Sequence, residues 1–245
     1  MNMPRSTTTL AWLALLFLPA LPAYLWAWPR LDGREEDAFQ VLTYLYLLLG
    51  GLLITRLWGS PAAIGFTRRN FWPGLLAGLL YTGGVVLGLL ATNLSHFTLP
   101  ASLPAFAWQV FFYFILVGLT EEWIFRGLLY TALDEWRGAS LAILGSAVLF
   151  GLYHLPSQGW RGFLATMLFG LFAALVRHRT GSFLALILIH GLYDILVISL
   201  LPAGLPPGLA GLHIDQPLLI LLADGLFLGS FIYIWRFHSP RQPAS

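Results

Sequence analysis

The sequence contains no cysteine and no lysine, and only 10% of its 245 residues are charged. Without cysteine, the chain has no disulfide framework, no thiolate metal site and no cysteine nucleophile. The net charge is only +2, and the arginines are scattered rather than gathered in a basic stripe, which argues against a nucleic-acid partner. Arginine used to the exclusion of lysine, with abundant alanine, glycine and leucine, is typical of a GC-rich bacterial genome.

Hydrophobic residues are abundant instead. They make up 58% of the chain, and the mean hydropathy is +0.77. A soluble domain of this length has too little interior to bury that much apolar surface, whereas a bundle of membrane helices needs it. The composition therefore predicts an integral membrane protein that is surrounded by a lipid bilayer.

Apolar runs of about the length that crosses a bilayer alternate with short polar breaks. The runs are approximately Thr8–Trp28, Ala38–Trp58, Trp72–Leu94, Pro104–Leu133, Ser140–Leu155, Trp160–Val176, Ser182–Leu201 and Gln216–Trp235. We therefore expect an all-α, polytopic membrane bundle of about eight transmembrane helices. The chain has no repeat of fixed period and no low-complexity linker, so residues 1–245 are expected to form a single integral membrane domain.

The arginines predict the orientation of this bundle. With about eight helices, most of the arginines between the runs fall on one side, and the other side receives only Arg30, Arg34 and Arg161. Positive charge gathers on the cytoplasmic side of membrane proteins. We expect a multi-pass protein of the bacterial inner membrane with both termini in the cytoplasm.

The segment Thr120–Gly127 breaks an otherwise apolar stretch with two carboxylates, Glu121 and Glu122, and with Arg126. Charged groups at membrane depth are costly and are kept mostly where they have a function. Residues four apart share one face of a helix, so Glu122 is expected to pair with Arg126. Glu121 then points about 100° away from Glu122 and is available to face a cavity.

Three further ionisable residues lie inside predicted helices, namely His154, His190 and Asp194. The i, i+4 spacing puts Phe150 next to His154 and His190 next to Asp194. Glu121 and His154 are about equally far from the polar turn at residues 134–138, so an antiparallel hairpin brings them to a similar depth. A third helix can add His190, and the catalytic core is then expected on helices 4, 5 and 7.

At these residues the sequence resembles a known family. The patterns EExxxR (Glu121, Glu122, Arg126), FxxxH (Phe150, His154) and HxxxN/D (His190, Asp194) occur in the order and spacing typical of the CPBP family of intramembrane proteases. This family includes the type II CAAX prenyl endopeptidases and bacterial Abi-type, bacteriocin-processing proteins. The motifs lie in a core of about residues 104–201. The resemblance implies a site that is reached from the cytosolic side.

The resemblance also implies a role for each of these residues. Glu121 would be the general base, His154 would help to bind and activate water, and His190 would stabilise the oxyanion of a cleaved peptide or membrane-protein substrate. Asp194 stands where many relatives have Asn, and an ionised Asp cannot donate to an oxyanion. Either Asp194 is protonated or it orients His190, and we favour orientation. Glu122, Arg126 and Phe150 would support the site.

Two alternatives remain open. Glu121, His154 and His190 have the ligand types of a catalytic zinc site, although the sequence has no HExxH motif. We favour a glutamate protease without a cofactor over this zinc enzyme. The same buried residues would also suit a proton or ion relay in a transporter, or survive in a non-catalytic protein of the immunity type.

Overall fold

The computed structural model describes residues 4–27, 30–91, 100–200 and 217–237. Within these ranges the regular structure is helical and there is no strand, which confirms the predicted all-α class. The α-helices are α1 (Arg5–Ala27), α2 (Gly33–Thr55), α3 (Phe71–Ala91), α4 (Leu103–Phe111), α5 (Leu119–Glu121), α6 (Tyr130–Arg137), α7 (Ala139–Thr180), α8 (Leu184–Asp194) and α9 (Pro217–Arg236). Two 3₁₀ segments, η2 (Arg56–Trp58) and η3 (Pro61–Ile64), and three π-helical segments, η4 (Phe112–Gly118), η5 (Glu122–Leu129) and η6 (Ile195–Leu200), complete the description.

Six helical segments in the described residues are long and apolar enough to cross a membrane. They are Arg5–Ala27, Gly33–Trp58, Phe71–Ala91, Leu103–Arg137, Ala139–Thr180 and Leu218–Arg236, and the shorter segment Leu184–Leu200 is also apolar. The chain therefore has the architecture of a multi-pass membrane protein. The count differs from the prediction of about eight because α7 contains two predicted runs and α8 with η6 is short.

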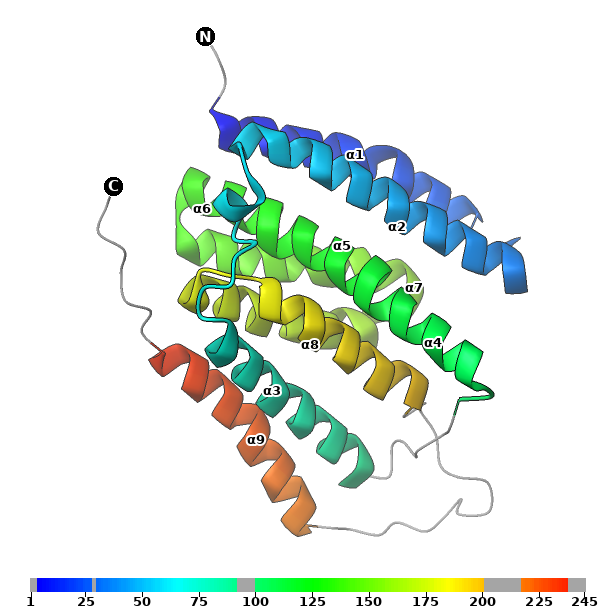
Figure 1. Ribbon diagram of the computed structural model, residues 1–245, viewed down its shortest axis with the longest axis vertical. Coiled ribbons are helices and arrows are strands. Elements are labelled where there is room, and N and C mark those ends of the chain that lie inside the picture. Colours follow the sequence, from blue (N-terminus) through cyan, green and yellow to red (C-terminus); the bar gives the residue numbers. More distant parts are fainter. Residues whose placement is uncertain (1–3, 28–29, 92–99, 201–216, 238–245) are drawn as a thin grey trace. The chain divides into compact units, whose positions relative to one another are not determined.

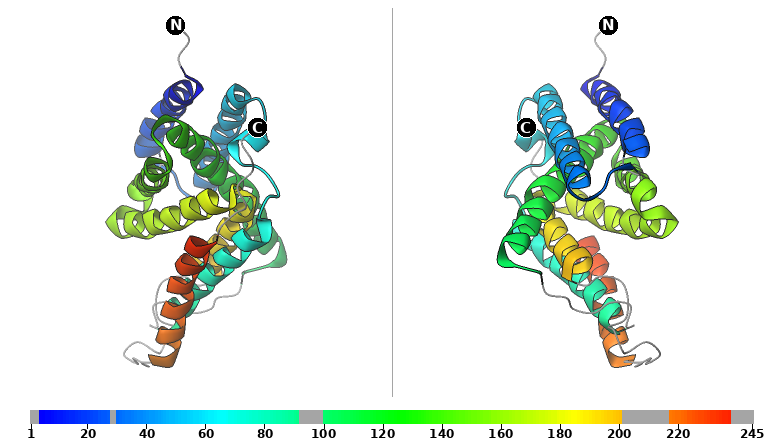
Figure 2. Two further views of the ribbon diagram at one scale, coloured as in Figure 1. Left: turned by 90° about the vertical axis from the view of Figure 1, so that its left-hand side faces the viewer. Right: turned by 90° about the vertical axis from the view of Figure 1, so that its right-hand side faces the viewer.

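The 42 residues of α7 form two helical limbs rather than one straight rod. At Gly159 the backbone leaves the helical region, with φ 65° and ψ −168°, and the chain turns sharply, as Figure 2 shows. The limbs pack closely, because a Cβ built at Gly151 would lie 2.9 Å from the Phe163 carbonyl oxygen and one at Gly170 3.1 Å from the Ala147 Cα. These limbs correspond to the predicted runs Ser140–Leu155 and Trp160–Val176.

The chain divides into two compact units. The first unit contains residues 1–69 and 119–184, and the second contains residues 70–118 and 185–245. In the first unit α1 and α2 lie side by side (Figure 1), and the Tyr46 hydroxyl donates to the Leu16 carbonyl at 3.1 Å. The N-terminal end of α1 meets the end of α6, where Arg5 Nε lies 3.0 Å from Glu135 Oε2.

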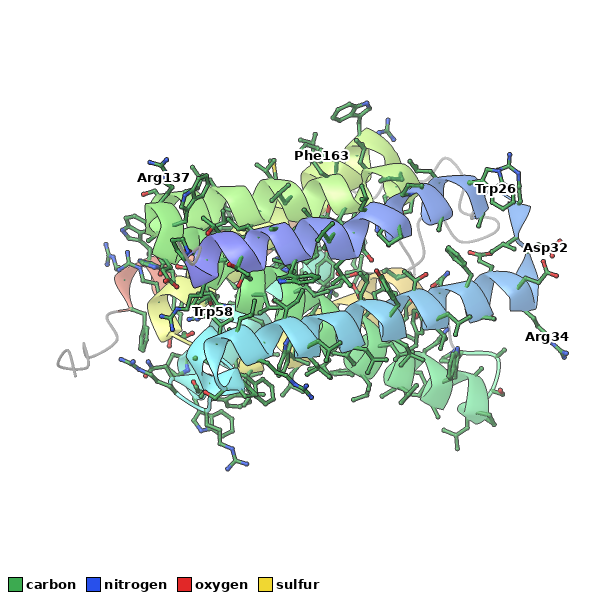
Figure 3. The ribbon with its side chains drawn as sticks, turned by 90° about the horizontal axis from the view of Figure 1, so that it is seen from above. Trp26, Asp32, Arg34, Trp58, Arg137 and Phe163 are labelled. Atoms are coloured by element: carbon green, nitrogen blue, oxygen red, sulfur yellow. The ribbon has the colours of Figure 1, made fainter. Side chains whose placement is uncertain are left out.

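Polar residues mark the two ends of the first unit. Trp58 and Arg137 lie at one end, and Asp32 and Arg34 lie at the other, as Figure 3 shows. This separation matches the predicted alternation of polar breaks between two sides of a membrane. Helices of this unit thus run from one polar end to the other, with apolar surface between.

In the second unit α3 packs along α9. Gly84 makes this approach close, since a Cβ there would lie 2.7 Å from the Phe227 backbone nitrogen. Helix α8 packs on α3 through Ile189 against Gly78 and on η4 through Gly191 against Phe114. Small residues of this kind let membrane helices approach each other closely.

Candidate active site

Glu121 lies where α5 meets the π-helical segment η5, and its side chain is only 2% exposed. One carboxylate oxygen, Oε1, accepts a hydrogen bond of 2.8 Å from the hydroxyl of Tyr44 on α2. The other oxygen, Oε2, lies 3.7 Å from Nε2 of His154 on α7. The two oxygens of one carboxylate therefore have different neighbours, a fixed donor on one side and an imidazole on the other.

The tautomer of His154 follows from its second contact. Its Nδ1 lies 2.9 Å from the Phe150 carbonyl oxygen. A carbonyl only accepts, so Nδ1 must carry the proton and donate it to this bond. In the neutral ring, Nε2 then carries the lone pair and faces Glu121 as an acceptor. The predicted proximity of Glu121 and His154 agrees with the 3.7 Å between Oε2 and Nε2.

Phe150 connects this pair to a buried ion pair. Glu122 Oε1 and Arg126 Nη1 are 3.1 Å apart, and both side chains are completely buried. The Arg126 guanidinium carbon lies 4.2 Å from the centre of the Phe150 ring, and the His154 ring centre lies 4.6 Å from that of Phe150. A desolvated guanidinium over an aromatic face is a favourable cation–π contact. The Phe150 ring thus separates the charged pair from the imidazole while touching both.

The motif-bearing helix is π-helical on both sides of Glu121. Segment η4 ends at Gly118, and segment η5 begins at Glu122. π-helical turns are rare and are found frequently at functional sites. Trp123 fastens η5 to α2, because its indole Nε1 donates to the Thr55 hydroxyl at 2.9 Å.

Arg177, on the second limb of α7, forms hydrogen bonds that hold η5 in place. Its Nε donates to the Arg126 carbonyl at 3.2 Å, and its Nη2 donates to the Ile64 carbonyl at 3.1 Å. The guanidinium fits against Gly65, where φ is +94° and a Cβ would collide with the Arg177 side chain. The Arg177 guanidinium therefore joins α7 to η5 and η3, and it does so at the backbone of Arg126, a member of the buried ion pair.

His190 and Asp194 belong to the second unit. Both lie on α8 and are nearly buried, with 4% and 7% of their surfaces exposed. His190 Nε2 is 3.6 Å from Asp194 Oδ2, as the i, i+4 spacing predicts. The π-helical segment η6 starts at Ile195, immediately after Asp194. The meeting of His190 with Glu121 and His154 stays a prediction.

The described residues contain no group of three or more His, Asp or Glu side chains arranged to hold a metal ion. Glu121 and His154 are adjacent, and both are residue types that bind zinc, but a zinc site requires at least one further protein ligand. The zinc and metal-free interpretations accordingly both stay predictions.

Sequence reasoning missed two contributors to this site, Tyr44 and Arg177. Tyr44 is 77 residues from Glu121 along the chain, and one tyrosine in an apolar helix gives no signal that distinguishes it from its neighbours. In the sequence Arg177 is one of the arginines between the predicted runs. Its packing against Gly65 follows from tertiary structure and has no local signature.

These observations define a class, a polytopic helical membrane protein with a buried carboxylate and imidazole pair. A protein-family model described as "Type II CAAX prenyl endopeptidase Rce1-like" matches residues 103–196. This range contains every predicted site residue from Glu121 to Asp194, and the match confirms the predicted resemblance to the CAAX protease family.

One curated relative is an "Uncharacterized 24.3 kDa protein" from Escherichia coli. It is 28% identical to this chain over 173 residues, which cover 65% of this chain and 78% of the relative. No solved structure gives a significant match.

Proposed function

We propose that this protein is an intramembrane endopeptidase that hydrolyses a peptide bond of a peptide or membrane-protein substrate near the cytosolic face of the membrane. The observation that carries the proposal is the pair of buried Glu121 and partly buried His154, with 3.7 Å between Oε2 and Nε2, inside the segment that matches the Rce1-like family model. A general base next to an oriented imidazole is what activation of a water molecule requires.

The spacing of this pair suits a water molecule better than a direct bond. A separation of 3.7 Å exceeds hydrogen-bond length, and polar atoms at such a distance are commonly bridged by water. A water there would donate one proton toward Glu121 Oε2 and the other toward His154 Nε2, which is an acceptor in the neutral ring. Its oxygen lone pair would remain directed away from both residues, toward a substrate carbonyl.

The reaction then balances in two steps. Glu121 takes a proton as the water oxygen attacks the scissile carbonyl carbon, which gives a tetrahedral oxyanion. Collapse of this intermediate breaks the C–N bond, and Glu121 returns the proton to the leaving nitrogen. The products are a new carboxylic acid, which keeps the second proton of the water, and a new amine. In water they ionise to a carboxylate and an ammonium group, and Glu121 is regenerated as a carboxylate.

His190 would supply the electrostatic stabilisation that the oxyanion needs. Donors aimed at a developing negative charge in a site that excludes water contribute strongly to catalysis. Asp194, whose Oδ2 lies 3.6 Å from His190 Nε2, would orient this ring. This part of the mechanism requires that α8 brings His190 to the Glu121–His154 pair during the reaction.

A liposome assay tests the proposed function. The purified protein is reconstituted, incubated with a library of membrane-inserted peptides, and the products are identified by mass spectrometry. We expect cleavage by the wild type and none by Glu121→Ala or His154→Ala. Glu135→Gln is the matched control, because Glu135 is a partly exposed carboxylate paired with Arg5. Proton-coupled flux without cleavage would contradict the protease proposal and favour a transporter. If the protein showed neither cleavage nor flux, a non-catalytic protein of the immunity type would be favoured.

Chelation separates the glutamate mechanism from the zinc alternative. We propose that Glu121 acts without a metal, so full cleavage activity should survive exhaustive chelation and dialysis. Loss of activity that zinc alone restores would overturn this part of the proposal, and bound zinc would then be expected on Glu121, His154 and His190.

The orientation of the protein in the membrane is a separate part of the proposal. We propose that the polar end of the first unit that carries Trp58 and Arg137 faces the cytoplasm, as the positive-inside rule predicts. From the distribution of arginines in the sequence, we propose also that both termini lie in the cytoplasm. A reporter fused after Ser245 should behave as cytoplasmic, and extracytoplasmic behaviour would contradict this orientation.

A further inference from the structure

We propose that Tyr44 is a positioning residue for the base Glu121: its phenol holds one carboxylate oxygen so that the other faces His154 and the attacking water. This inference rests on the proposed function. Tyr44 lies outside the Rce1-like domain at residues 103–196, and the family motifs do not include it.

The contact is direct and has the geometry of a strong hydrogen bond. The Tyr44 hydroxyl donates to Glu121 Oε1 at 2.8 Å. Bonds to a charged acceptor are shorter and stronger than neutral ones. Because Oε1 is held by this donor, rotation of the carboxyl group is restricted, and Oε2 keeps its place 3.7 Å from His154 Nε2.

Tyr44 is held in place by the packing of α2 on the motif-bearing helix. Gly51, two turns further along α2, lies against the motif-bearing helix, since a Cβ there would be in van der Waals contact with Ile124 and Trp123, at 3.5 Å from each. Thr55, one turn beyond, accepts the hydrogen bond from Trp123. Tyr44, Gly51 and Thr55 are spaced by seven and four residues, so they lie on one face of α2.

This face gives Tyr44 a precise role. The same helix surface that packs against η5 also carries the hydroxyl that reaches Glu121, so the position of the donor is fixed by rigid elements and not by a loop. A group held in this way preorganises a catalytic residue and reduces the reorganisation needed in the transition state. Its loss should therefore lower the rate of the chemical step and leave substrate binding unchanged.

Tyr46 is a matched control on the same helix. Its hydroxyl donates to the Leu16 carbonyl of α1 at 3.1 Å and so contacts a structural neighbour instead of the site. Tyr44→Phe and Tyr46→Phe each remove one phenolic hydroxyl and keep the ring. Comparison of the two variants separates loss of the Glu121 contact from the general loss of an interhelical hydrogen bond.

The first readout is kinetic. In the liposome assay, Tyr44→Phe should lower kcat by about tenfold with KM unchanged, the pattern expected when only transition-state stabilisation is lost. Tyr46→Phe should leave both constants within about twofold of the wild type. Equal kcat values for Tyr44→Phe and wild type would overturn the inference while leaving the proposed protease function intact.

The second readout does not depend on activity. Infrared difference spectra between wild type and Glu121→Gln identify the carboxyl band of Glu121. We expect Tyr44→Phe to shift this band and Tyr46→Phe to leave it in place, with thermal unfolding checked for both variants. An unshifted band would overturn the inference even if the wild type cleaves no peptide, whereas a shifted band in an inactive protein would show that the proposed function, and not the contact, is wrong.

Discussion

The two pairs of ionisable residues are held in different ways. Glu121 and His154 are 33 residues apart in the sequence and lie on different helices, and their 3.7 Å contact exists only because α7 packs against the motif-bearing helix. His190 and Asp194 are one turn apart on α8, so their 3.6 Å contact follows from the helix itself. The first pair is a product of tertiary packing and the second is local.

The difference extends to what surrounds each pair. The Glu121–His154 pair depends on α2 through Tyr44, on the Phe150 carbonyl through His154 and on Arg177 through the backbone of η5. In the local pair, both residues lie on α8, and the helical turn between them keeps them adjacent. Substitutions far from the chemistry should therefore disturb the first pair and spare the second.

The largest effect is expected at His154 itself. His154→Gln removes the imidazole acceptor opposite Glu121 and should lower kcat/KM for peptide cleavage by roughly 10²–10⁴-fold. His178→Gln is the matched control, because His178 contacts the Tyr130 hydroxyl at 3.0 Å and lies outside the proposed site. Similar losses in both variants would mean that the effect reports general damage to the fold.

The buried ion pair offers the next largest effect, on stability. Glu122→Gln leaves the completely buried Arg126 without its counter-charge and should lower the free energy of unfolding by about 3–5 kcal/mol. Steric-trap unfolding in bicelles measures this quantity. The double variant Glu122→Gln with Arg126→Met should recover much of the loss, and a double variant as unstable as the single one would contradict a pairing role for Arg126.

The role of the His190–Asp194 pair is tested by removing the imidazole of His190. His190→Ala should lower kcat by roughly 10²–10³-fold, as loss of an oxyanion donor does, while the thermal stability of the protein changes little. The measurement is the liposome cleavage rate at saturating peptide. A rate within about twofold of the wild type would remove His190 from the mechanism and leave the Glu121–His154 pair to act without it.

Asp194 should matter less than His190. If Asp194 only orients the ring, Asp194→Asn, which keeps the shape and an oxygen acceptor, should lower kcat by about tenfold or less, an effect of about 1.4 kcal/mol. Asp194→Leu should cost more than Asp194→Asn in the same assay. Equal rates for the Asn and Leu variants would show that the side chain at this position does not orient His190.

Much of this organisation could be predicted from the sequence, and the reason is periodicity. The apolar runs predict the helices, the i, i+4 spacing predicts the Glu122–Arg126 and His190–Asp194 contacts, and the hairpin around residues 134–138 brings Glu121 to His154. Each of these inferences uses only helix geometry and one short turn.

What could not be predicted depends on contacts between distant segments. The π-helical segments around Glu121 change the helical pitch without a sequence signal. Tyr44 and Arg177 reach their partners across 77 and 51 residues. Their partners are set by packing, which a single sequence does not encode in any local pattern.

The smallest effect is expected for a variant of α2 that tests whether this helix helps to position the Glu121–His154 pair. Thr55→Val removes the acceptor for the Trp123 indole and should lower stability by about 1 kcal/mol, with a modest loss of cleavage rate. Thr9→Val is its counterpart, because Thr9 on α1 accepts from Trp58 of η2 at 3.0 Å, a hydrogen bond that does not involve η5. The two variants should be similarly destabilised in thermal unfolding, and a loss of rate in the Thr9 variant alone would contradict the role of α2.

The most direct test of the central claim is single-turnover cleavage in H₂¹⁸O by reconstituted wild type, Glu121→Gln and Glu135→Gln, with the products analysed by mass spectrometry. The account predicts that wild type and Glu135→Gln place one ¹⁸O in the new carboxylate, and that Glu121→Gln forms this product roughly 10²–10⁴-fold more slowly. Labelled product formed by Glu121→Gln at the wild-type rate would contradict the assignment of Glu121 as the base.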